Sequence, residues 1–547
     1  MFHSQSNLRF LGAPAARSLL RYLPFSPCAG IYLALLSLAG CDAGDKRADL
    51  VILNGAEPES IDPAVITGQL EGRISYALFD GLLHFDRFGK PQPAIAERWD
   101  KSSDGKIYTF HLRSNAKWSN GDPVTATDFL LSWKRVLLPE TASEYVYLLY
   151  QVKNAKEFNE GTLKDFDKVG IKAIDEATFQ VELDAPVPYF LDLCAFMTLL
   201  PVHMPTVDKY GDDWIKPGKL VNDGPFLLKD WRLNYRIRLE KNPQYWDAEH
   251  VTLNTVDALP IENSITAYNF YASHVADLIL DKGLTPSSLI PELKVRPDFH
   301  AAPFLGTYFI RFNVTRKPLN DVRIRQAFAM VIDRNRIVEK ITQAGEPPAH
   351  SFTPPGTSDG YLPPKMFERN VQKAREMMAE AGYPDGKGFP SVTYLYDNKK
   401  LNEDIAVEIQ NMLADGLGVH VDLQKQEWKV YLNSLSQLDY DFARSSWVGD
   451  YNDPNTFLDC FVTGSGNNRT GWTSKEYDDL IAAAGREPDN KKRLQILQCA
   501  EEILLNQATP ICPLYFYVGI QIFDGQKFGG IEPNLLDEHP FREMYRK

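Results

Sequence analysis

The chain has 547 residues, of which 44% are apolar and 24% are charged, and its formal net charge at pH 7 is -13. This length exceeds what one ordinary hydrophobic core accommodates, so we expect two or three domains. The composition is typical of a soluble globular protein, and the negative charge argues against nucleic acid or an anionic bilayer surface as a partner of its main body.

The N-terminus is typical of a secretory signal. Residues 1–28 contain three arginines and no acid, and an apolar stretch follows over residues 29–37. This stretch falls short of the roughly 20 residues that span a bilayer. A basic region, a short apolar core and small residues before a cleavage point predict a signal peptide over residues 1–40. A short signal anchor and a misassigned start are the alternatives.

The first elements after this region follow clear local patterns. Residues 50–53 predict a strand, and the alternation of apolar and polar side chains over residues 108–112 predicts a half-buried strand. Thr125 is followed by Asp128 in a capping-box pattern, and apolar residues continue at helical spacing to Leu137. This combination predicts a helix that begins at Thr125.

A second strand pair and a long helix are predicted in the middle of the chain. Residues 226–228 and 235–239 alternate around a polar break at Asn234, which is typical of two adjacent strands. Asp321 opens an amphipathic pattern whose apolar side continues to Val338. We therefore expect one helix over this stretch.

The last third of the chain again mixes helices and strands. A helix is predicted from Asp404 to Gly416 and Gly418, and residues 419–423 predict a strand. Such elements without a βαβ rhythm throughout favour an α/β protein with separate lobes. We expect the chain to cross between the lobes more than once.

Four cysteines lie beyond the signal region: Cys194, Cys460, Cys499 and Cys512. Their spacing fits neither a C-x-x-C redox pair nor a zinc site. An oxidising compartment permits a disulfide between Cys499 and Cys512, but sequence does not show whether the geometry allows it. Buried free thiols are an alternative that the sequence favours at least as much.

A series of short motifs extends from about Leu50 to the C-terminus. They are Glu57–Pro63, Leu78–Leu82, Trp118–Ala126 with Asp128 and Phe129, Asn242–Trp246, Asn320–Arg325 and Asp450–Pro454. In this order and spacing they resemble the periplasmic oligopeptide-binding proteins of ABC importers. The relatives of those proteins include dipeptide, murein-tripeptide and nickel binders.

The resemblance implies an α/β, two-lobed binding-protein fold with an extra inserted domain. Domain I would combine residues 48–79, 204–305 and 518–547, domain II would be residues 80–203, and domain III would be residues 306–517. Two crossing strands would act as a hinge, and the ligand would be enclosed between domains I and III as they close.

The same kind of resemblance bears on localisation. The run Leu38-Ala39-Gly40-Cys41 looks like a bacterial lipobox, which implies cleavage before Cys41 and a diacylglycerol on that residue. Residues 41–47 would then be a lipid-anchored tether on the periplasmic side of the cell envelope. Asp42 resembles a retention signal for the inner membrane.

Peptide capture has definite chemical requirements. A free peptide is a zwitterion, and a receptor for many sequences must satisfy its backbone and both termini, for which strand addition is suited. The resemblance places backbone contacts at Ser445, Ser446, Trp447 and Val448 on one side of the ligand and at Thr67, Gly68 and Gln69 on the other. Gly449 is also expected to contact the ligand. The aromatic residues expected to line the cleft are Tyr145, Trp447 and Tyr517.

Asp450 is the strongest single-residue prediction. By resemblance it occupies the position of the aspartate that binds the α-ammonium of the ligand. A carboxylate enclosed by lobe closure needs a cationic partner, which a ligand ammonium supplies. The alternative is that Asp450 only caps the Tyr-Asn-Asp-Pro turn that follows it.

The ligand carboxylate is assigned less directly. The resemblance implies that Arg444 meets it, directly or through water, and that Arg316 serves the shortest ligands, although Arg316 could equally be a solvated surface residue. Two positions depart from the family pattern, Leu435 in place of an arginine and Asn402 in place of a histidine. These departures imply a different peptide length or a modified peptide.

An enzyme is not indicated. Residues 356–360 match G-x-S-x-G, but they lie in a Pro-rich loop rather than at the strand-to-helix turn that this motif requires. Nucleotide-binding and zinc-protease motifs are absent from the sequence, and the histidines lack ligand spacing. We expect no cofactor, no metal and a monomer that delivers peptides to importer permeases. A modified or non-peptide solute, such as a cell-wall peptide, nickel chelate or haem, and a signalling role are the alternatives.

Overall fold

The computed structural model of the protein describes residues 46–547, except for the side chains of residues 428 and 429. The predicted signal peptide and the predicted lipidation site Cys41 lie outside the described residues. Residues 48–547 form one compact unit. Within the described part of the chain, no helix is both long and apolar enough to cross a membrane.

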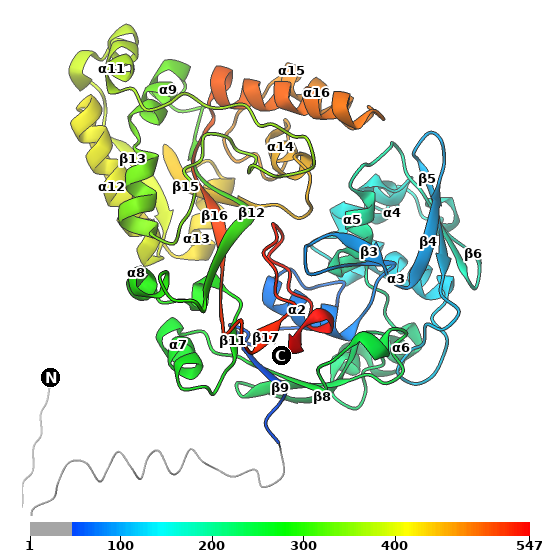
Figure 1. Ribbon diagram of the computed structural model, residues 1–547. Coiled ribbons are helices and arrows are strands. Elements are labelled where there is room, and N and C mark those ends of the chain that lie inside the picture. Colours follow the sequence, from blue (N-terminus) through cyan, green and yellow to red (C-terminus); the bar gives the residue numbers. More distant parts are fainter. Residues whose placement is uncertain (1–45) are drawn as a thin grey trace, which may run out of the picture. The chain divides into compact units, whose positions relative to one another are not determined.

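A ten-stranded mixed sheet organises this unit, in the order β14-β13-β15-β12-β16-β11-β1-β10-β9-β8. Its strands are β1 (Leu50–Leu53), β8 (Phe226–Arg232), β9 (Arg236–Lys241), β10 (Thr255–Leu259), β11 (Leu278–Ile279), β12 (Phe299–Phe312), β13 (Val392–Asp397), β14 (Val421–Gln426), β15 (Phe442–Val448) and β16 (Ile511–Phe523). One half of the sheet is built from early strands and the other from late strands (Figure 1). After β16, which pairs with β11, Phe528 and Phe541 return to the core of the early half. The chain therefore passes between two lobes more than once, as predicted.

The strands β12 and β16 connect the two halves. They pair antiparallel from Phe299 opposite Ile522 to Arg311 opposite Ile511, and the register shifts between Pro303 and Thr307. An irregularity of this kind bends a strand pair locally. The two long crossing strands confirm the expected connection between the lobes.

A separate four-stranded sheet follows the order β4-β5-β7-β6. Its strands are β4 (Ala96–Lys101), β5 (Ile107–Leu112), β6 (Ile171–Asp175) and β7 (Thr178–Glu182), and the helix α3 (Ala126–Leu137) covers it. The predicted capping box is present, because the Thr125 N–H donates to Asp128 Oδ2 over 2.7 Å. Trp133 of α3 packs edge-on against Phe179 of β7, with ring centroids 5.2 Å apart.

The remaining elements surround these sheets (Figure 1). The other helices are α2 (Gln69–Leu78), α4 (Ala155–Asn159), α5 (Phe190–Ala195), α6 (Met204–Tyr210), α7 (Ser264–Ala272), α8 (Ile290–Leu293), α9 (Val322–Val331), α10 (Arg334–Ile337), α11 (Val371–Glu380), α12 (Lys400–Leu417), α13 (Trp428–Ser436), α14 (Asn455–Leu458), α15 (Lys475–Ala484) and α16 (Asn490–Glu502). The short strands are β2 (Leu83–Phe85), β3 (Pro91–Pro93), β17 (Phe528–Gly529) and β18 (Tyr545–Arg546). The helices α9, α11 and α12 share a core with β12–β14.

The helix predicted from Asp321 is shorter than expected. It begins at its cap, Asp321, but ends at Val331. Asp333 then accepts the N–H of Arg336 and caps the separate helix α10, and Val338 lies in a further helical turn. A second N-cap within the apolar pattern therefore divides it, although the buried side still continues to Val338.

Other boundaries move by a few residues. The helix predicted from Asp404 begins at Lys400, and the strand predicted from residue 419 begins at Val421. Tyr235 lies in the turn between β8 and β9 rather than in a strand, and its side chain is 55% exposed. Asn234 beside it has a positive φ of 56°, which makes the turn.

All four described cysteines are free thiols. Cys499 is exposed, whereas Cys512 is buried on β16, where the guanidinium of Arg334 contacts its sulfur. Of the two alternatives, the structure therefore shows free thiols and no disulfide among the described residues.

Candidate functional site

Asp450 lies just after β15 and faces two tyrosines. The hydroxyls of Tyr147 and Tyr145 donate to its carboxylate over 3.1 Å and 3.4 Å. Its backbone N–H donates to Thr456 Oγ1 over 3.1 Å. The following turn is instead capped by Asp453, whose Oδ1 accepts the N–H of Asn455. The two tyrosine contacts of the Asp450 carboxylate thus come from side chains that are 305 and 303 residues away in the chain.

The environment of Asp450 raises its pKa. Burial raises the pKa of this carboxyl to about 6, although the hydrogen bonds from Tyr147, Tyr145 and Thr456 oppose the shift. No basic side chain lies within ion-pair distance of Asp450 in the described part of the structure. A desolvated carboxylate without a cation is costly, so a ligand cation would be stabilised here.

Two cavities of about 300 Å³ each meet at Asp450. The first, here called the Thr67 cavity, is lined by Thr67, Gln69, Tyr76, Phe85, Tyr145, Phe196, Met197, Phe304, Val448, Gly449, Asp450, Leu536 and Glu538. The second, here called the Trp447 cavity, is lined by Tyr147, Trp447, Asp450, Tyr451, Thr456, Asp459, Ser465, Gly466 and Asn467. Seven of the predicted site residues therefore lie around two adjoining hollows.

The strand β15 presents an open edge beside these cavities. One edge pairs with β12, where the N–H of Gly449 donates to Leu305 and Asp441 accepts from Asn313. By alternation, Ser445 and Trp447 also bond toward β12, and the N–H and C=O groups of Ser446 and Val448 point outward. The strand β13 pairs only with Phe442 and Ala443, so it does not cover this outward edge.

The partner segment lies at the start of α2. Gly68 is the N-cap of this helix and Gln69 is its first residue. The side chains of Thr67 and Gln69 are exposed and line the Thr67 cavity opposite Val448 and Gly449. The fold therefore brings together two predicted segments that are nearly 400 residues apart in the chain.

Arg444 and Asn402 are placed differently. Arg444 is buried, its guanidinium lies 3.5 Å from Asp397, and it lines neither cavity. The amide of Asn402 donates to the same carboxylate over 2.7 Å and accepts from the Tyr308 hydroxyl. Both residues belong to one buried polar network. Leu435 is also buried, in a small apolar cluster.

Arg316 and Tyr517 lie at the periphery. The guanidinium of Arg316, 43% exposed, pairs with Asp439 over 3.0 Å on the surface. The ring of Tyr517 on β16 lies 6.4 Å from that of Phe304, which lines the Thr67 cavity. Tyr517 thus borders the site through Phe304, whereas Arg316 lines neither cavity.

Several site residues were not anticipated from sequence. Tyr147 contacts Asp450, Asp459 lines the Trp447 cavity, and Glu538 lines the Thr67 cavity. Burial raises the pKa of the Glu538 carboxyl to about 8. Tyr147 is two residues from the predicted site residue Tyr145, which was a weak indication that it also belongs to the site. No local sequence pattern marks Asp459 or Glu538 as site residues.

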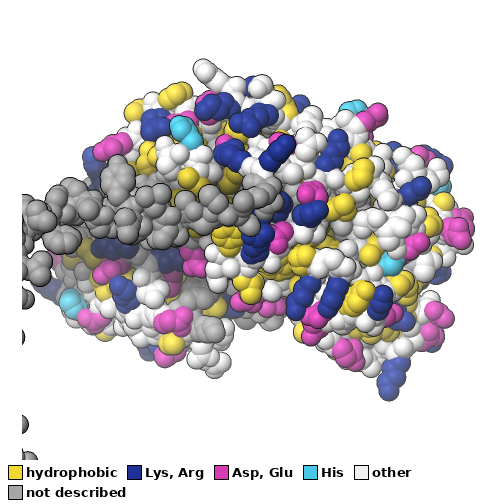
Figure 2. Space-filling view, turned by 90° about the horizontal axis from the view of Figure 1, so that it is seen from below, with side chains coloured by type: hydrophobic (Ala, Val, Ile, Leu, Met, Phe, Trp, Pro, Cys, Tyr) yellow, Lys and Arg dark blue, Asp and Glu magenta, His cyan; other side chains and the backbone are white. Residues whose placement is uncertain are grey.

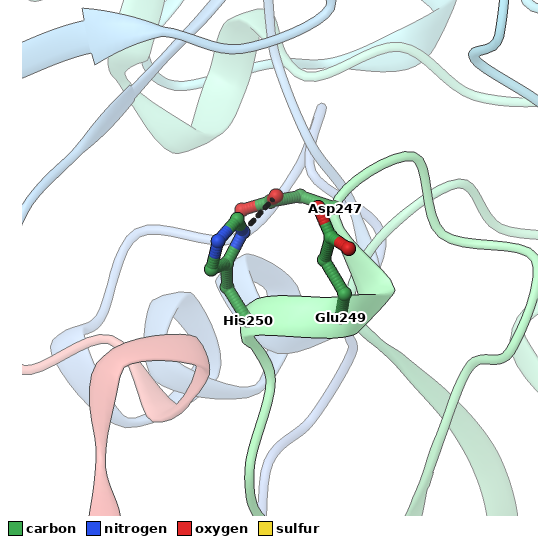
Figure 3. A group of neighbouring side chains, drawn as sticks. All are labelled: Asp247, Glu249 and His250. Carbon is green, nitrogen blue, oxygen red and sulfur yellow. Dashed lines mark hydrogen bonds and ion pairs between the residues drawn. The ribbon is translucent and has the colours of Figure 1, made fainter.

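Three residues of types that can bind a metal ion lie close together on the surface, away from the two cavities. Asp247, Glu249 and His250 follow β9, and their donor atoms lie within 4.8 Å of one another (Figure 3). His250 Nδ1 lies 2.5 Å from Asp247 Oδ1, and this contact raises the pKa of the imidazole. The hydrogen bond between Asp247 and His250 accounts for the close approach of these side chains.

On the face shown in Figure 2, basic and acidic side chains are interspersed.

The G-x-S-x-G match lies in a turn-rich loop. Gly356, Ser358 and Gly360 all have positive φ, and the N–H of Ser358 donates to the side chain of Asn452. No strand precedes this loop and no helix follows it directly. The loop is therefore not the strand-to-helix turn of a nucleophilic serine.

Comparison with known proteins gives extensive similarity. The signature of the bacterial extracellular solute-binding proteins, family 5 Middle, matches residues 90–469. The periplasmic oligopeptide-binding protein OppA of Salmonella typhimurium is 38% identical over 534 residues, covering 94% of this chain and 97% of the relative. A probable deoxycholate-binding periplasmic protein of Escherichia coli, YgiS, is 35% identical over 504 residues, covering 90% and 92%.

Solved structures agree with the sequence comparison. The crystal structure of a periplasmic oligopeptide-binding protein of an oligopeptide ABC transporter from Borrelia burgdorferi superposes with a TM-score of 0.79 at 34% identity. The match covers 92% of this chain and all of that one. The mixed sheet and its two halves are therefore those of a two-lobed binding-protein fold.

Proposed function

Because the chain belongs to the bacterial extracellular solute-binding proteins of family 5, we propose that it captures short peptides and delivers them to an ABC importer. The similar oligopeptide-binding proteins support this class of solute. Identity alone does not select the ligand, since a relative of nearly equal similarity is named as a probable deoxycholate binder. The choice of a peptide as the ligand therefore rests on the chemistry of the site around Asp450.

Asp450 is the observation that carries the proposal. Its carboxylate is desolvated, is held by two tyrosine hydroxyls and has no cationic partner among the described side chains. The α-ammonium of a peptide supplies that partner through a charge-assisted hydrogen bond. A bile acid has no such group and would leave the carboxylate unpaired.

The backbone of the peptide adds to the open edge of β15. The outward N–H and C=O groups of Ser446 and Val448 bond one side of the ligand, and residues 67–69 contact the other. The ammonium at Asp450 places the ligand N-terminus at the C-terminal end of β15, so the ligand runs antiparallel to this strand. Main-chain bonding of this kind is independent of ligand sequence.

The carboxylate end of the ligand lies toward Arg444, Tyr517 and Arg316. Both arginines already pair with aspartates, Arg444 with Asp397 and Arg316 with Asp439. Neither is therefore a free cation that clamps a carboxylate at one fixed distance. This supports binding of the ligand carboxylate through water. It also supports ligands of more than one length.

We propose a non-enzymatic transport protein with three domains. Domain I combines residues 48–79, 204–305 and 518–547, domain II comprises residues 80–203 and domain III comprises residues 306–517. The pair β12 and β16 bends at its irregular segment and lets domains I and III close on the ligand. The protein acts as a monomer.

A mass-spectrometric experiment tests peptide capture. The protein is purified without refolding and denatured in acid, and the released small molecules are analysed. We expect short peptides from the wild type and few from Asp450→Ala. Asp479→Ala, which removes an exposed carboxylate of α15, is the matched control and should release as much as the wild type. Release of a bile acid or another non-peptide from the wild type would contradict the proposal.

The membrane anchor is a separate part of the proposal. The lipobox motif supports a diacylglycerol on Cys41, with Asp42 favouring the inner membrane. Growth with radiolabelled palmitate should label the wild-type protein and not Cys41→Ala, and fractionation should show which membrane holds the label. A labelled Cys41→Ala variant would contradict this assignment.

A further inference from the structure

The Trp447 cavity lies next to the ammonium position and has its own chemistry. Asp450 lines both cavities, so a ligand ammonium bound to it lies at the entrance of the Trp447 cavity. The α-carbon of a peptide is bonded to that nitrogen, and a side chain from it can extend into the cavity. A volume of about 300 Å³ accommodates one long side chain.

The walls of this cavity favour a cation. Asp450 and Asp459 are both lining residues, and none of the lining residues is basic. Trp447, Tyr147 and Tyr451 also line this cavity, and aromatic rings of this kind attract cations. The side chain of Asp459 accepts a hydrogen bond from the amide of Asn455 over 3.3 Å, and the backbone N–H of Cys460 also contributes to its stabilisation, but it has no ion pair within the described structure.

The electrostatics agree with this geometry. Burial, followed by the charges on Asp450 and Asp453, raises the pKa of the Asp459 carboxyl to about 7. Asp453 itself is neutralised by a buried two-point bond to Arg493. The guanidinium of Arg311 donates a hydrogen bond to the carbonyl of Asn467, a lining residue, and forms no ion pair with Asp450 or Asp459. Two carboxylates thus share one hollow, and a single ammonium at Asp450 neutralises only one of them.

We propose that the Trp447 cavity binds a cationic side chain, lysine-like or arginine-like, on the N-terminal residue of the ligand, with Asp459 as its counter-charge. This inference rests on the proposed capture of peptides at Asp450 and adds a preference within that class. The N-terminal residue then presents two positive charges to two carboxylates. A neutral side chain of the same length fills the cavity but leaves Asp459 without a partner.

Calorimetry with matched tripeptides tests the inference. The probes are Lys-Ala-Ala, norleucine-Ala-Ala and Ala-Ala-Ala, each titrated into protein freed of bound peptide. We expect Lys-Ala-Ala to bind the wild type at least tenfold more tightly than norleucine-Ala-Ala. In Asp459→Asn this preference should fall below threefold, while the affinity for Ala-Ala-Ala changes by less than threefold. The control is Asp479→Asn, which removes one negative charge from an exposed residue of α15. This variant should keep the wild-type preference for Lys-Ala-Ala.

The outcomes separate the two proposals. Equal affinities of Lys-Ala-Ala and norleucine-Ala-Ala for the wild type would overturn the cation site while leaving peptide capture intact. A preference that survives in Asp459→Asn, or equally tight binding of Ala-Lys-Ala, would also overturn it. The wild-type comparisons require no variant, so they decide even if Asp459→Asn does not fold. If none of the tripeptides binds, peptide capture itself fails.

Discussion

At the scale of the residue, Asp450 combines two properties that oppose each other in the free protein. It is half-buried and its surroundings destabilise the ionised form, yet its function requires that form. The tyrosine hydroxyls reduce this cost but do not remove it. Such a residue lowers the stability of the ligand-free protein in exchange for binding.

Replacing Asp450 with asparagine should therefore have opposite effects on stability and binding. The pKa in the folded protein, about 6, exceeds the ordinary value of 3.8. The native state thus holds a proton that the unfolded state loses, and stability falls as pH rises from about 4 through about 6. At pH 8, Asp450→Asn should raise the unfolding free energy by about 1–3 kcal/mol.

The same variant should weaken Ala-Ala-Ala binding by about 2–5 kcal/mol, because the ammonium loses its charged partner. Thermal denaturation without ligand and calorimetry with ligand measure the two effects. Asp479→Asn, an exchange of an exposed carboxylate on α15, serves as the surface control and should change neither. A variant that loses both stability and binding would indicate a merely structural role for Asp450.

The affinity for Ala-Ala-Ala should also depend on pH. Binding needs ionised Asp450 and a protonated ligand amine, so affinity should be highest near pH 7, fall by up to tenfold per pH unit below about 6, and decline again above about 8 as the ammonium loses its proton. The groups that face this carboxylate are Tyr145, Tyr147, Thr456 and the neighbouring Asp459, whose own titration near 7 broadens the transition. Calorimetry from pH 5 to 8 measures the profile. A flat profile in this range would contradict the role of the ionised group.

At the scale of the element, β15 has two edges with different tasks. Ser445 and Trp447 bond to β12, while Ser446 and Val448 face the open edge. Proline lacks an N–H and is tolerated in strands where that N–H faces away from the ladder. The two edges can therefore be tested separately.

Ser446→Pro should remove an outward donor and leave the ladder with β12 in place. We expect at least tenfold weaker binding of Ala-Ala-Ala, with a melting temperature lowered by only a few degrees. Ser446→Ala keeps the N–H and should bind like the wild type. Calorimetry and thermal melting provide the measurements. Equal affinities of the two variants would show that this donor does not contact the ligand.

The turn after β15 is anchored by α16. Arg493 makes a two-point bond to Asp453 over 2.7 Å and 2.8 Å, and both residues are buried. Arg493→Ala leaves the Asp453 carboxylate buried and unpaired, so it should lower the unfolding free energy by about 3–5 kcal/mol. The exposed pair of Lys475 and Asp479 is the control, and Lys475→Ala should have an effect below about 1 kcal/mol. Urea denaturation compares the two variants, and similar values for both would contradict the assigned role of the buried pair.

At the scale of the whole molecule, the site is assembled from distant parts of the chain. Tyr145 comes from the region of the small sheet, Thr67 and Gln69 from the start of α2, and Asp450 from the end of β15. The rings of Tyr189 and Tyr451 stack with centroids 4.1 Å apart and provide a second contact between the first and last of these regions. Ligand binding should thus be coupled to the relation between the lobes.

Closure can be measured by small-angle X-ray scattering. Adding saturating Ala-Ala-Ala to ligand-free protein should reduce the radius of gyration, because the ligand contacts both lobes and favours the closed arrangement. Asp450→Asn at the same peptide concentration should show no change. An unchanged radius for a wild type that calorimetry shows to be saturated would contradict closure about β12 and β16.

Much of this architecture could be predicted from local sequence patterns. The strand over residues 108–112 and the capping box at Thr125 and Asp128 follow from periodicity and cap chemistry, which depend on neighbours in the chain. The order of the motifs indicated the family and the crossing of the chain between lobes. Element ends were less predictable, because a competing cap such as Asp333 can divide one apolar pattern into two helices.

Only the tertiary structure decided the electrostatic state of the site. The sequence by itself determined that Asp450 precedes a turn, and the family resemblance of its motifs indicated the zwitterionic class of ligand. It did not show that Tyr147, 303 residues earlier, reaches that carboxylate, or that Asp397 neutralises Arg444. Charge, burial and cavity shape are set by residues brought together through space. The pattern along the chain therefore specified the elements, and the packing of the lobes specified their chemistry.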